Sequence, residues 1–183
     1  MSLEKLISKF KSDSDYKVCV SSYDTPLGKI ISVADDYDLY TVAFEDSKNC
    51  EKMLITVQKE LCCMYIGRKN NVLQRFENEL SSYFKGDLNL FKTPLKMLGS
   101  DFQKSVWEKL LEVPYGKTQT YSDIAKALGR PASHARAVGA ACGANAHVII
   151  IPCHRIVATG SNGGYSCGIE RKDKLIQLEK SYT

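Results

Sequence analysis

The sequence predicts an α/β N-terminal domain, a small antiparallel sheet with helices, followed by a mainly α-helical C-terminal domain that contains a helix-turn-helix. Three observations predict this fold class. Runs rich in β-branched and aromatic residues fill the first half, amphipathic helical spacing fills the second, and a glycine-containing turn joins two of the later helices. An extended, proline-containing connector separates the halves, and we expect domains over residues 1–92 and 93–183.

The first half is read as strands followed by helices. We predict a meander of three strands, over residues 18–23, 29–33 and 39–44, with turn residues between them. Two helices are expected next, over residues 49–65 and 73–84, and Gly86 ends the second.

The second half is read as three short helices. Ser100 can cap a helix that carries apolar residues at helical spacing and ends before Gly116. Thr120 and Asp123 form a variant of the capping box and open a helix over residues 121–128. A further helix starts at Pro131 or Ser133 and runs through Cys142, so a helix, a tight turn and a helix follow one another.

That last helix carries very small side chains. Gly and Ala dominate it, with Arg136 as its one large polar residue, although glycine costs a helix about 1 kcal/mol relative to alanine. Close packing against another helix and close approach of a ligand's backbone are both explanations, and the sequence alone does not choose between them.

Composition and charge restrict the class of protein. The 183 residues are 44% hydrophobic and 25% charged, as in an ordinary globular chain. Residues 1–100 hold 14 basic and 14 acidic side chains, whereas residues 101–183 hold 11 and 7, so the formal charge of +4 lies entirely in the second part. This surplus is compatible with a polyanionic partner. No apolar run is long enough for a membrane span or a secretory signal, so we expect an intracellular protein, in the cytoplasm or the nucleus.

A Cys-His pair is the candidate for chemistry. Asn145 and a short apolar strand over residues 148–151 precede Cys153 and His154. A thiol attacks as thiolate and needs a base, and an imidazole needs a third group to fix its tautomer. On an extended backbone the two side chains point apart, which favours a bridging water. A buried, inert thiol beside an incidental histidine is the alternative. The seven cysteines show no CxxC pair and no local spacing that supports a zinc site, so we expect reduced thiols and no metal site.

The run IPCHRIV resembles the O6-alkylguanine-DNA alkyltransferase family closely. The resemblance is strong from about Ser100 onward and includes RAVG at residues 136–139, VPYG at 113–116 and the LIQLE segment at 175–179. The TPLG turn at residues 25–28, followed by strands, resembles the family's N-terminal domain less distinctively.

The resemblance implies a role for each residue of the reaction centre. It implies Cys153 as the alkyl acceptor, His154 as the residue that activates it through a water molecule, and Glu179 as the carboxylate that holds the histidine. Tyr121 is implied to lie beside the target nucleotide, where it donates to the base ring and rotates the 3′ phosphate. Asn145 is implied to form the turn between the recognition helix and the reactive loop.

The resemblance also implies the contacts with DNA. Arg136 would intercalate where the flipped base has left, and Tyr165 and Ser166 would close the nucleotide pocket. The other implied substrate contacts are Ala135, Ala137, Gly139 and Ile156.

The implied activity is repair of duplex DNA by a single-turnover transfer. The alkyl group passes irreversibly from O6 of guanine, and from O4 of thymine, to the cysteine after the damaged base has been flipped out of the duplex. The resemblance also implies that the protein acts as a monomer and needs no cofactor. Two departures from the family pattern matter. Cys167 stands where most relatives have Gly, which we expect to restrict bulky adducts, and Cys142 and Gly143 stand where some relatives place Arg, which removes a phosphate contact.

Two other function classes compete with this reading. A DNA-binding module without catalysis would not need the set of Cys153, His154 and Glu179. A thiol hydrolase would need an oxyanion hole, for which the sequence holds no signal, and would leave the helix that carries Arg136 unexplained.

Overall fold

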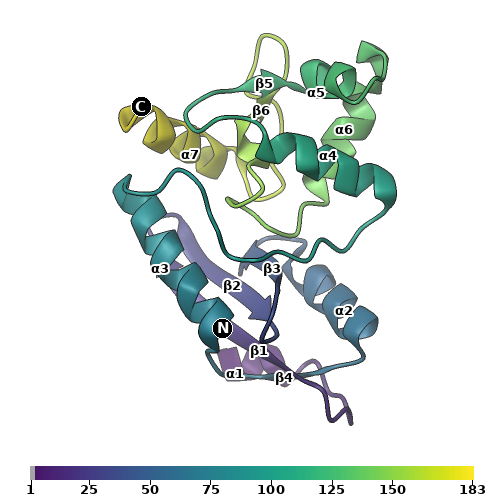
Figure 1. Cartoon of the computed structure of the whole chain (residues 1–183), viewed down its shortest axis with the longest axis vertical. Coiled ribbons are helices and arrows are strands. Elements are labelled where there is room, and N and C mark those ends of the chain that lie inside the picture. Colours follow the sequence, from purple (N-terminus) through teal and green to yellow (C-terminus); the bar gives the residue numbers. More distant parts are fainter. Residues whose placement is uncertain (1–2) are drawn as a thin grey trace. The chain divides into compact units, whose positions relative to one another are not determined.

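The computed structural model describes residues 3–183 and divides the chain into two compact units, Met1–Leu98 and Gly99–Thr183 (Figure 1). The first unit combines a small sheet with helices and the second is mainly helical, so the predicted α/β domain followed by a mainly α-helical domain is confirmed. The predicted boundary between residues 92 and 93 lies in the same connector, and the functional division that it implies stays a prediction. No helix within residues 3–183 is both long and apolar enough to cross a membrane.

A four-stranded mixed sheet forms the centre of the first unit. Its strand order is β3-β2-β1-β4, with β1–β2 and β2–β3 antiparallel and β4 parallel to β1. The strands span β1 (Lys17–Thr25), β2 (Gly28–Ala34), β3 (Leu39–Phe44) and β4 (Met64–Ile66). The predicted antiparallel meander is therefore present, but the sheet as a whole is mixed, because the unpredicted β4 pairs with β1 in parallel.

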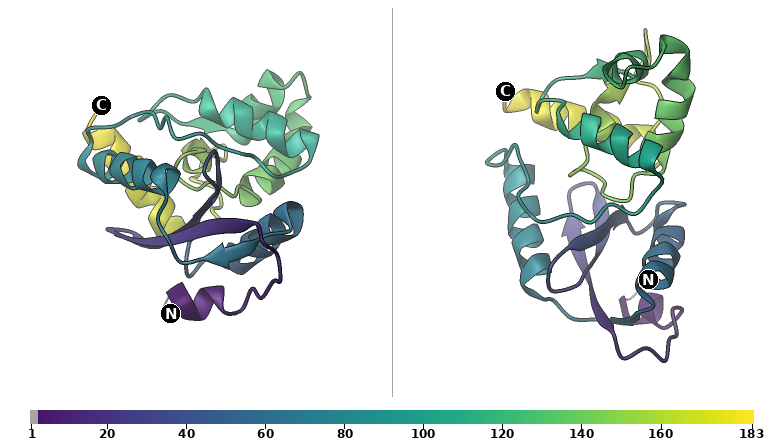
Figure 2. Two further views of the ribbon diagram at one scale, coloured as in Figure 1. Left: turned by 60° about the horizontal axis from the view of Figure 1, so that its bottom comes forward. Right: turned by 45° about the vertical axis from the view of Figure 1, so that its right-hand side comes forward.

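Helices cover both faces of this sheet (Figure 2). They are α1 (Leu3–Ile7), α2 (Cys50–Leu61) and α3 (Asn71–Lys85). Buried residues of α1 and α2 form one core with β1, β2 and β3, including Leu6, Leu54 and Val20. On the other face Phe76 of α3 meets the ring of Tyr23 edge to face, at 5.6 Å between centroids.

One predicted helix of this unit is too long. The expected helix over residues 49–65 ends at Leu61, because Cys62 adopts a left-handed conformation with φ 46° and the chain then turns back into β4. The expected helix over residues 73–84 is present as α3, and Gly86 ends it at φ 81°.

The second unit contains four α-helices between short connecting elements. They are α4 (Asp101–Leu111), α5 (Tyr121–Ala127), α6 (Ala135–Gly143) and α7 (Ile169–Ser181). Two 3₁₀ turns, η1 (Ala132–His134) and η2 (Cys153–Arg155), and a two-stranded ladder of β5 (Gln119–Thr120) and β6 (Ile156–Val157) join them.

Local sequence signals explain where α4 and α5 begin. Ser100 and Gln103 form a reciprocal capping box at α4, and Thr120 and Asp123 form the predicted variant at α5. The indole of Trp107 on α4 is buried and donates a hydrogen bond to the carbonyl of Ala141 on α6 at 2.9 Å. Helix α6 is thereby fixed against the core of its unit.

The predicted strand over residues 148–151 is wrong, because the segment forms a buried turn. The amide of Ile151 donates to the carbonyl of His147 at 2.9 Å, and Ile149 has φ 73°. This left-handed conformation is unusual for a β-branched residue. The Asn145 side chain supports the turn at both ends, since its oxygen accepts from the His147 amide and its nitrogen donates to the Ile151 carbonyl, each at 2.8 Å.

Candidate active site

A cavity of about 570 Å³ in the second unit brings most of the predicted site residues together. Helix α5 contributes Tyr121 at its first residue, helix α6 contributes one wall, and the segments around Cys153 and Ser166 contribute the rest. The lining consists of Tyr121, Ala135, Arg136, Gly139, Cys142, Gly143, Cys153, Gly164, Tyr165 and Ser166.

The glycines of α6 are open to this cavity. A Cβ atom at Gly139 would come within only 3.7 Å of the Tyr121 ring, which is an ordinary contact, and at Gly143 it would meet no atom within 4 Å. Packing inside the unit therefore does not require glycine at either position. Of the two explanations open at the sequence level, the structure favours close approach of a ligand.

Cys153 is held at the floor of the cavity by its neighbours. It lies in the 3₁₀ turn η2, not on the extended backbone expected from the sequence, and only 3% of its surface is exposed. The Asn145 side chain, which supports the preceding turn, donates from Nδ2 to the Cys153 sulfur at 3.1 Å. Asn145 therefore both stabilises the turn before Cys153 and holds the thiol in position.

Burial raises the pKa of the Cys153 thiol to about 12, so the resting group is the neutral thiol. The hydrogen bond from Asn145 and the positive charge of Lys172 act in the opposite direction, and a thiolate charge on Cys167 would add to the increase. A base that accepts the thiol proton is therefore necessary for attack by sulfur at neutral pH.

Lys172 is a buried cation beside the cavity that has no counterpart among the predicted site residues. Its Nζ donates to the carbonyls of Ile156 and Gly164, at 2.5 and 3.0 Å, and lies 5.8 Å from the centre of the Tyr121 ring. Gly164 also accepts from the Tyr121 hydroxyl at 3.2 Å. A lysine on a charged C-terminal helix is ordinarily a surface residue, so no sequence signal marked it as part of this site.

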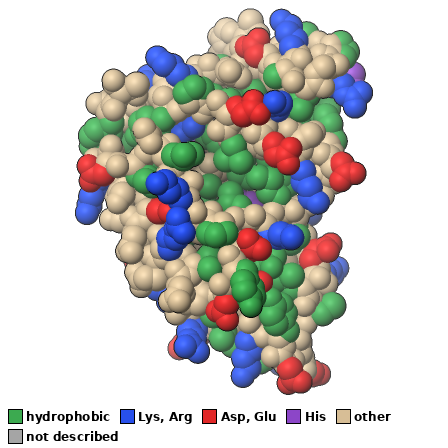
Figure 3. Space-filling model, viewed as in Figure 1, with side chains coloured by type: hydrophobic (Ala, Val, Ile, Leu, Met, Phe, Trp, Pro, Cys, Tyr) green, Lys and Arg blue, Asp and Glu red, His purple; other side chains and the backbone are tan. Residues whose placement is uncertain are grey.

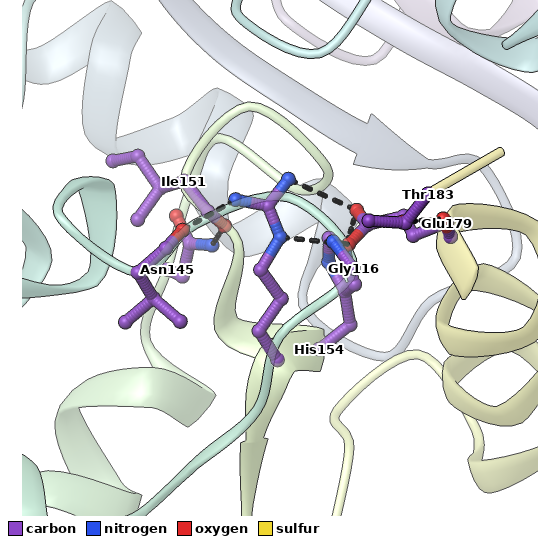
Figure 4. Close-up of polar contacts among 8 residues, drawn as sticks. Gly116, Asn145, Ile151, His154, Glu179 and Thr183 are labelled. Carbon is purple, nitrogen blue, oxygen red and sulfur yellow. Dashed lines mark hydrogen bonds and ion pairs between the residues drawn. The ribbon is translucent and has the colours of Figure 1, made fainter.

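His154 and Glu179 form a fully buried pair behind the cavity. Nε2 of His154 lies 2.7 Å from Oε1 of Glu179, and both side chains are at most 1% exposed (Figure 4). An ionised carboxylate only accepts hydrogen bonds, so Nε2 carries the proton and Nδ1 carries the lone pair. Nδ1 is buried and makes no hydrogen bond with the residues that the structure describes.

Arg155 and Gly116 complete the environment of Glu179, and sequence reasoning had given neither a role. Nε and Nη2 of Arg155 donate to the two carboxylate oxygens at 2.9 and 3.0 Å, and the Gly116 amide donates at 3.0 Å. Burial acts to raise the pKa of Glu179, but the interactions with His154 and then with Arg155 outweigh it and hold the pKa at about 2. Burial lowers the pKa of His154, which keeps the imidazole neutral.

Some predicted site residues lie outside the cavity lining. Ile156 is fully buried in β6, and Ala137 is half-buried on α6. Asn145, His154 and Glu179 lie behind Cys153.

The two departures from the family pattern differ in position. Cys167 is buried beside Ser166 and is not part of the lining, whereas Cys142 is part of it. The effect of Cys167 on bulky adducts stays a prediction.

The chemistry that this arrangement supports is attack by a buried thiol on a group held in the cavity. Within residues 3–183, no group of three or more His, Cys, Asp or Glu side chains is arranged to hold a metal ion. Exposed charges of both signs are interspersed on the face seen in Figure 3, with no single basic patch there. Arg136 is an exposed residue of the cavity lining and is a cation available to an anionic ligand there.

Comparison with known proteins gives two family matches that together span most of the chain. Residues 18–97 match the family described as 6-O-methylguanine DNA methyltransferase, ribonuclease-like domain. Residues 101–181 match the family described as 6-O-methylguanine DNA methyltransferase, DNA binding domain.

Individual relatives agree with these matches. A methylated-DNA–protein-cysteine methyltransferase of Methanosarcina acetivorans is 37% identical over 161 residues, which cover 87% of this chain and 96% of the relative. A probable methylated-DNA–protein-cysteine methyltransferase of Acanthamoeba polyphaga mimivirus is 43% identical over 132 residues, with 70% and 87% covered. The crystal structure of Mycobacterium tuberculosis OGT in complex with DNA matches with a TM-score of 0.77 at 32% identity, and 90% of this chain and 94% of that chain are covered.

Proposed function

This chain belongs to the 6-O-methylguanine DNA methyltransferase family and acts in DNA repair as a methylated-DNA–protein-cysteine methyltransferase, and we propose that the groups it removes are alkyl groups on O6 of guanine in duplex DNA. Cys153 is the acceptor in this proposal. O4 of alkylated thymine is a second substrate atom. The enzyme acts as a monomer and turns over once.

The observation that carries this proposal is the position of one thiol. Cys153 faces the cavity that α6 borders, and a neutral histidine with a bound carboxylate lies next to it in the chain. In the reaction the sulfur forms a bond to the alkyl carbon while the bond from that carbon to O6 breaks, and the electron pair leaves on the guanine. The thiol proton passes to Nδ1 of His154 through a water molecule, and the released guanine takes up a proton.

The residues around the thiol have distinct roles. His154 is the base, and Glu179 stabilises the imidazolium that forms. Asn145 holds the loop and donates to the sulfur. Tyr121 borders the cavity and contacts the target nucleotide, where it donates to the base ring.

Reaction at O6 requires the guanine to leave the base stack, at a cost of a few kcal/mol. We assign α5 and α6 as a helix-turn-helix whose small residues, Ala135, Ala137 and Gly139, allow the DNA backbone to approach. Arg136 fills the space that the flipped base leaves, and Tyr165 and Ser166 close over the nucleotide. Ile156 supports the pocket from β6. The exposure of Arg136 at the cavity mouth supports this assignment.

The proposal is tested by following transfer from excess duplex DNA that contains O6-methylguanine. We expect the reaction to stop at one methyl group per protein, because a thioether is a poor leaving group and no second nucleophile is assigned to remove it. The same assay with O4-methylthymine duplex tests the second substrate. Continued turnover beyond one equivalent, or no transfer from either duplex, would contradict the proposal.

Base flipping is tested separately with Arg136→Ala. We expect this variant to lose more activity on duplex DNA than on free O6-methylguanine base, since a free base needs no extrusion. Lys180→Ala, which removes an exposed cation from α7, is the matched control and should leave both reactions unchanged. Equal losses on the two substrates would give Arg136 a structural role instead.

A further inference from the structure

The arginine that follows the Cys-His pair has so far no role in the reaction. Arg155 is 7% exposed, and its guanidinium contacts the Glu179 carboxylate through two nitrogens, at 2.9 and 3.0 Å. Such a two-point contact is the geometry in which arginine binds a carboxylate most strongly. Because both groups are buried, the charges of Arg155 and Glu179 cancel at short range.

We propose that Arg155 is a positioning residue for alkyl transfer, whose guanidinium neutralises Glu179 so that His154 remains an uncharged imidazole able to take the proton of the Cys153 thiol. This inference rests on the proposed function, because it assigns His154 as the base. The inference adds Arg155 as a second partner of the Glu179 carboxylate. This partner sets the protonation state of His154 before the substrate binds.

The charges that act on His154 determine its protonation state. Complete burial disfavours the imidazolium most, Glu179 favours it, and the positive charges of Arg155 and Lys172 disfavour it. Glu179 and Lys172 act from α7 and Arg155 acts from η2. The Cys153 thiol, next to His154 in η2, is neutral at rest, and so is Tyr115, whose ring lies 5.6 Å from the guanidinium.

Removal of Arg155 alone would change this balance in one direction. Glu179 would keep its charge without the compensating cation, and an uncompensated carboxylate at hydrogen-bond distance raises the pKa of an imidazole. His154 would then bind a proton from solvent at a higher pH. A protonated His154 has no lone pair at Nδ1 and cannot accept the thiol proton.

Arg155 also holds the backbone of its unit. Its Nη1 donates to the carbonyl of Val113 at 2.7 Å, and the Gly116 amide reaches the same carboxylate. A purely structural role would therefore lower stability and the amount of active protein. A purely structural role would not change the pH at which His154 becomes protonated and the transfer rate falls. That pH therefore distinguishes a structural role of Arg155 from a positioning role.

The experiment measures the rate of methyl transfer against pH with protein in saturating excess over O6-methylguanine duplex. Wild type is compared with Arg155→Gln, Arg155→Lys and the double variant Arg155→Gln/Glu179→Gln. We expect the acid limb of the Arg155→Gln profile to lie about 1–3 pH units above that of wild type. Arg155→Lys keeps the positive charge and should show a smaller shift. The double variant removes anion and cation together and should return the limb towards its wild-type position.

A second measurement on the unaltered protein keeps the inference testable if Arg155→Gln does not fold. The chain has three histidines, so nitrogen NMR with His134→Gln and His147→Gln for assignment can follow His154 directly. We expect the neutral Nε2–H tautomer at pH 7, with a pKa below the ordinary value of about 6.5. A wild-type His154 that is imidazolium at pH 7 would overturn the inference.

The outcomes separate this inference from the proposed function. An acid limb at the same pH in wild type and folded Arg155→Gln would overturn the role of Arg155 while transfer to Cys153 still occurred. An absence of transfer at every pH in wild type would instead contradict the proposed function, and the NMR titration would still report the charge of His154.

Discussion

Asp35 in the first unit and Glu179 in the second are buried carboxylates that each collect several hydrogen bonds, and the two differ in their donors. Asp35 in the first unit accepts from the hydroxyls of Tyr16 and Tyr40, at 2.8 and 2.7 Å, and from two backbone amides that follow it. Glu179 in the second unit accepts from an arginine, a histidine and one backbone amide. Both carboxyls have lowered pKa values, because these donors outweigh the effect of burial.

The difference shows how a structural carboxylate is distinguished from one in a reactive site. The hydroxyl donors of Asp35 do not ionise near neutral pH, since burial and the Asp35 carboxylate raise the pKa of Tyr16 to about 12 and that of Tyr40 as well. Asp35 therefore joins the ends of β1, β2 and β3 through partners that do not change charge near neutral pH. Glu179 holds a histidine whose free nitrogen can take a proton, next to a thiol that must lose one.

The largest effect is expected from Glu179→Gln. Loss of the carboxylate leaves Arg155 buried without its anion, which should lower the free energy of unfolding by about 3 kcal/mol. The transfer rate at neutral pH should fall about 100-fold, because an imidazolium at His154 is no longer stabilised. The rate should recover partly at alkaline pH, where the thiolate forms without a base.

Rate–pH profiles and urea denaturation check this prediction. Glu170→Gln, an exposed carboxylate in the first turn of the same helix, is the control and should match wild type in both. Superimposable rate profiles for Glu179→Gln and wild type would remove Glu179 from the mechanism.

A smaller effect, on stability alone, is expected from Asp35→Asn. The amide cannot replace all the charged hydrogen bonds of the carboxylate, so the free energy of unfolding should fall by about 2 kcal/mol. The transfer rate per folded molecule should stay at the wild-type value. Denaturation and single-turnover kinetics measure the two quantities, with Asp36→Asn as the exposed control. A slower transfer in folded Asp35→Asn would contradict the division of roles.

Acid should weaken both carboxylate centres, with a sign that follows from their pKa values. A carboxyl whose folded pKa is lowered stabilises the protein above its unfolded pKa and loses this contribution as pH falls through the folded value. For Glu179 the window runs from about 4.3 in the unfolded chain down to about 2. We expect the free energy of unfolding to decrease between pH 5 and pH 2, by about 2 kcal/mol for this group. Urea titrations at several pH values should show a smaller decrease in Glu179→Gln, and an equal decrease would refute the assignment.

The smallest effect is expected from Tyr16→Phe. The side chain is partly exposed and its hydroxyl donates one hydrogen bond to the Asp35 carboxylate, so its loss should cost about 1 kcal/mol of stability. Tyr37→Phe, at a residue that is 78% exposed, should cost nothing measurable. Thermal unfolding of both variants checks the difference, and equal melting temperatures would show that the Tyr16 hydroxyl adds no stability.

Local signals in the sequence were sufficient for many elements of the fold. The caps at Ser100 and Thr120 were predictable because each depends on residues three positions apart. Strand β4 was missed because its three residues form a strand only through pairing with β1, far away in the chain. The side chains of the apolar run before Cys153 favour a strand, whereas the Asn145 side chain stabilises a turn there through two hydrogen bonds with residues of the folded loop.

The candidate site was predictable to the extent that a motif carried it. The resemblance pointed to Cys153 and His154, and the pair of His154 with Glu179 is present at hydrogen-bond distance. The roles of Arg155 and Lys172 depend on burial and on partners remote in sequence. The sequence around a charged residue in a motif, or on a polar helix, indicates neither that its side chain is buried nor which remote residue it contacts.

The most direct test of the account is to locate the alkyl group after one reaction. Protein treated with duplex DNA containing O6-methylguanine is digested, and its cysteine peptides are mapped by mass spectrometry. We expect one added methylene group, on the peptide that contains Cys153, and none in Cys153→Ala, which should still bind DNA because phosphate contacts supply much of that affinity. A methyl group on Cys142 or Cys167, the other two buried thiols of this unit, would contradict it.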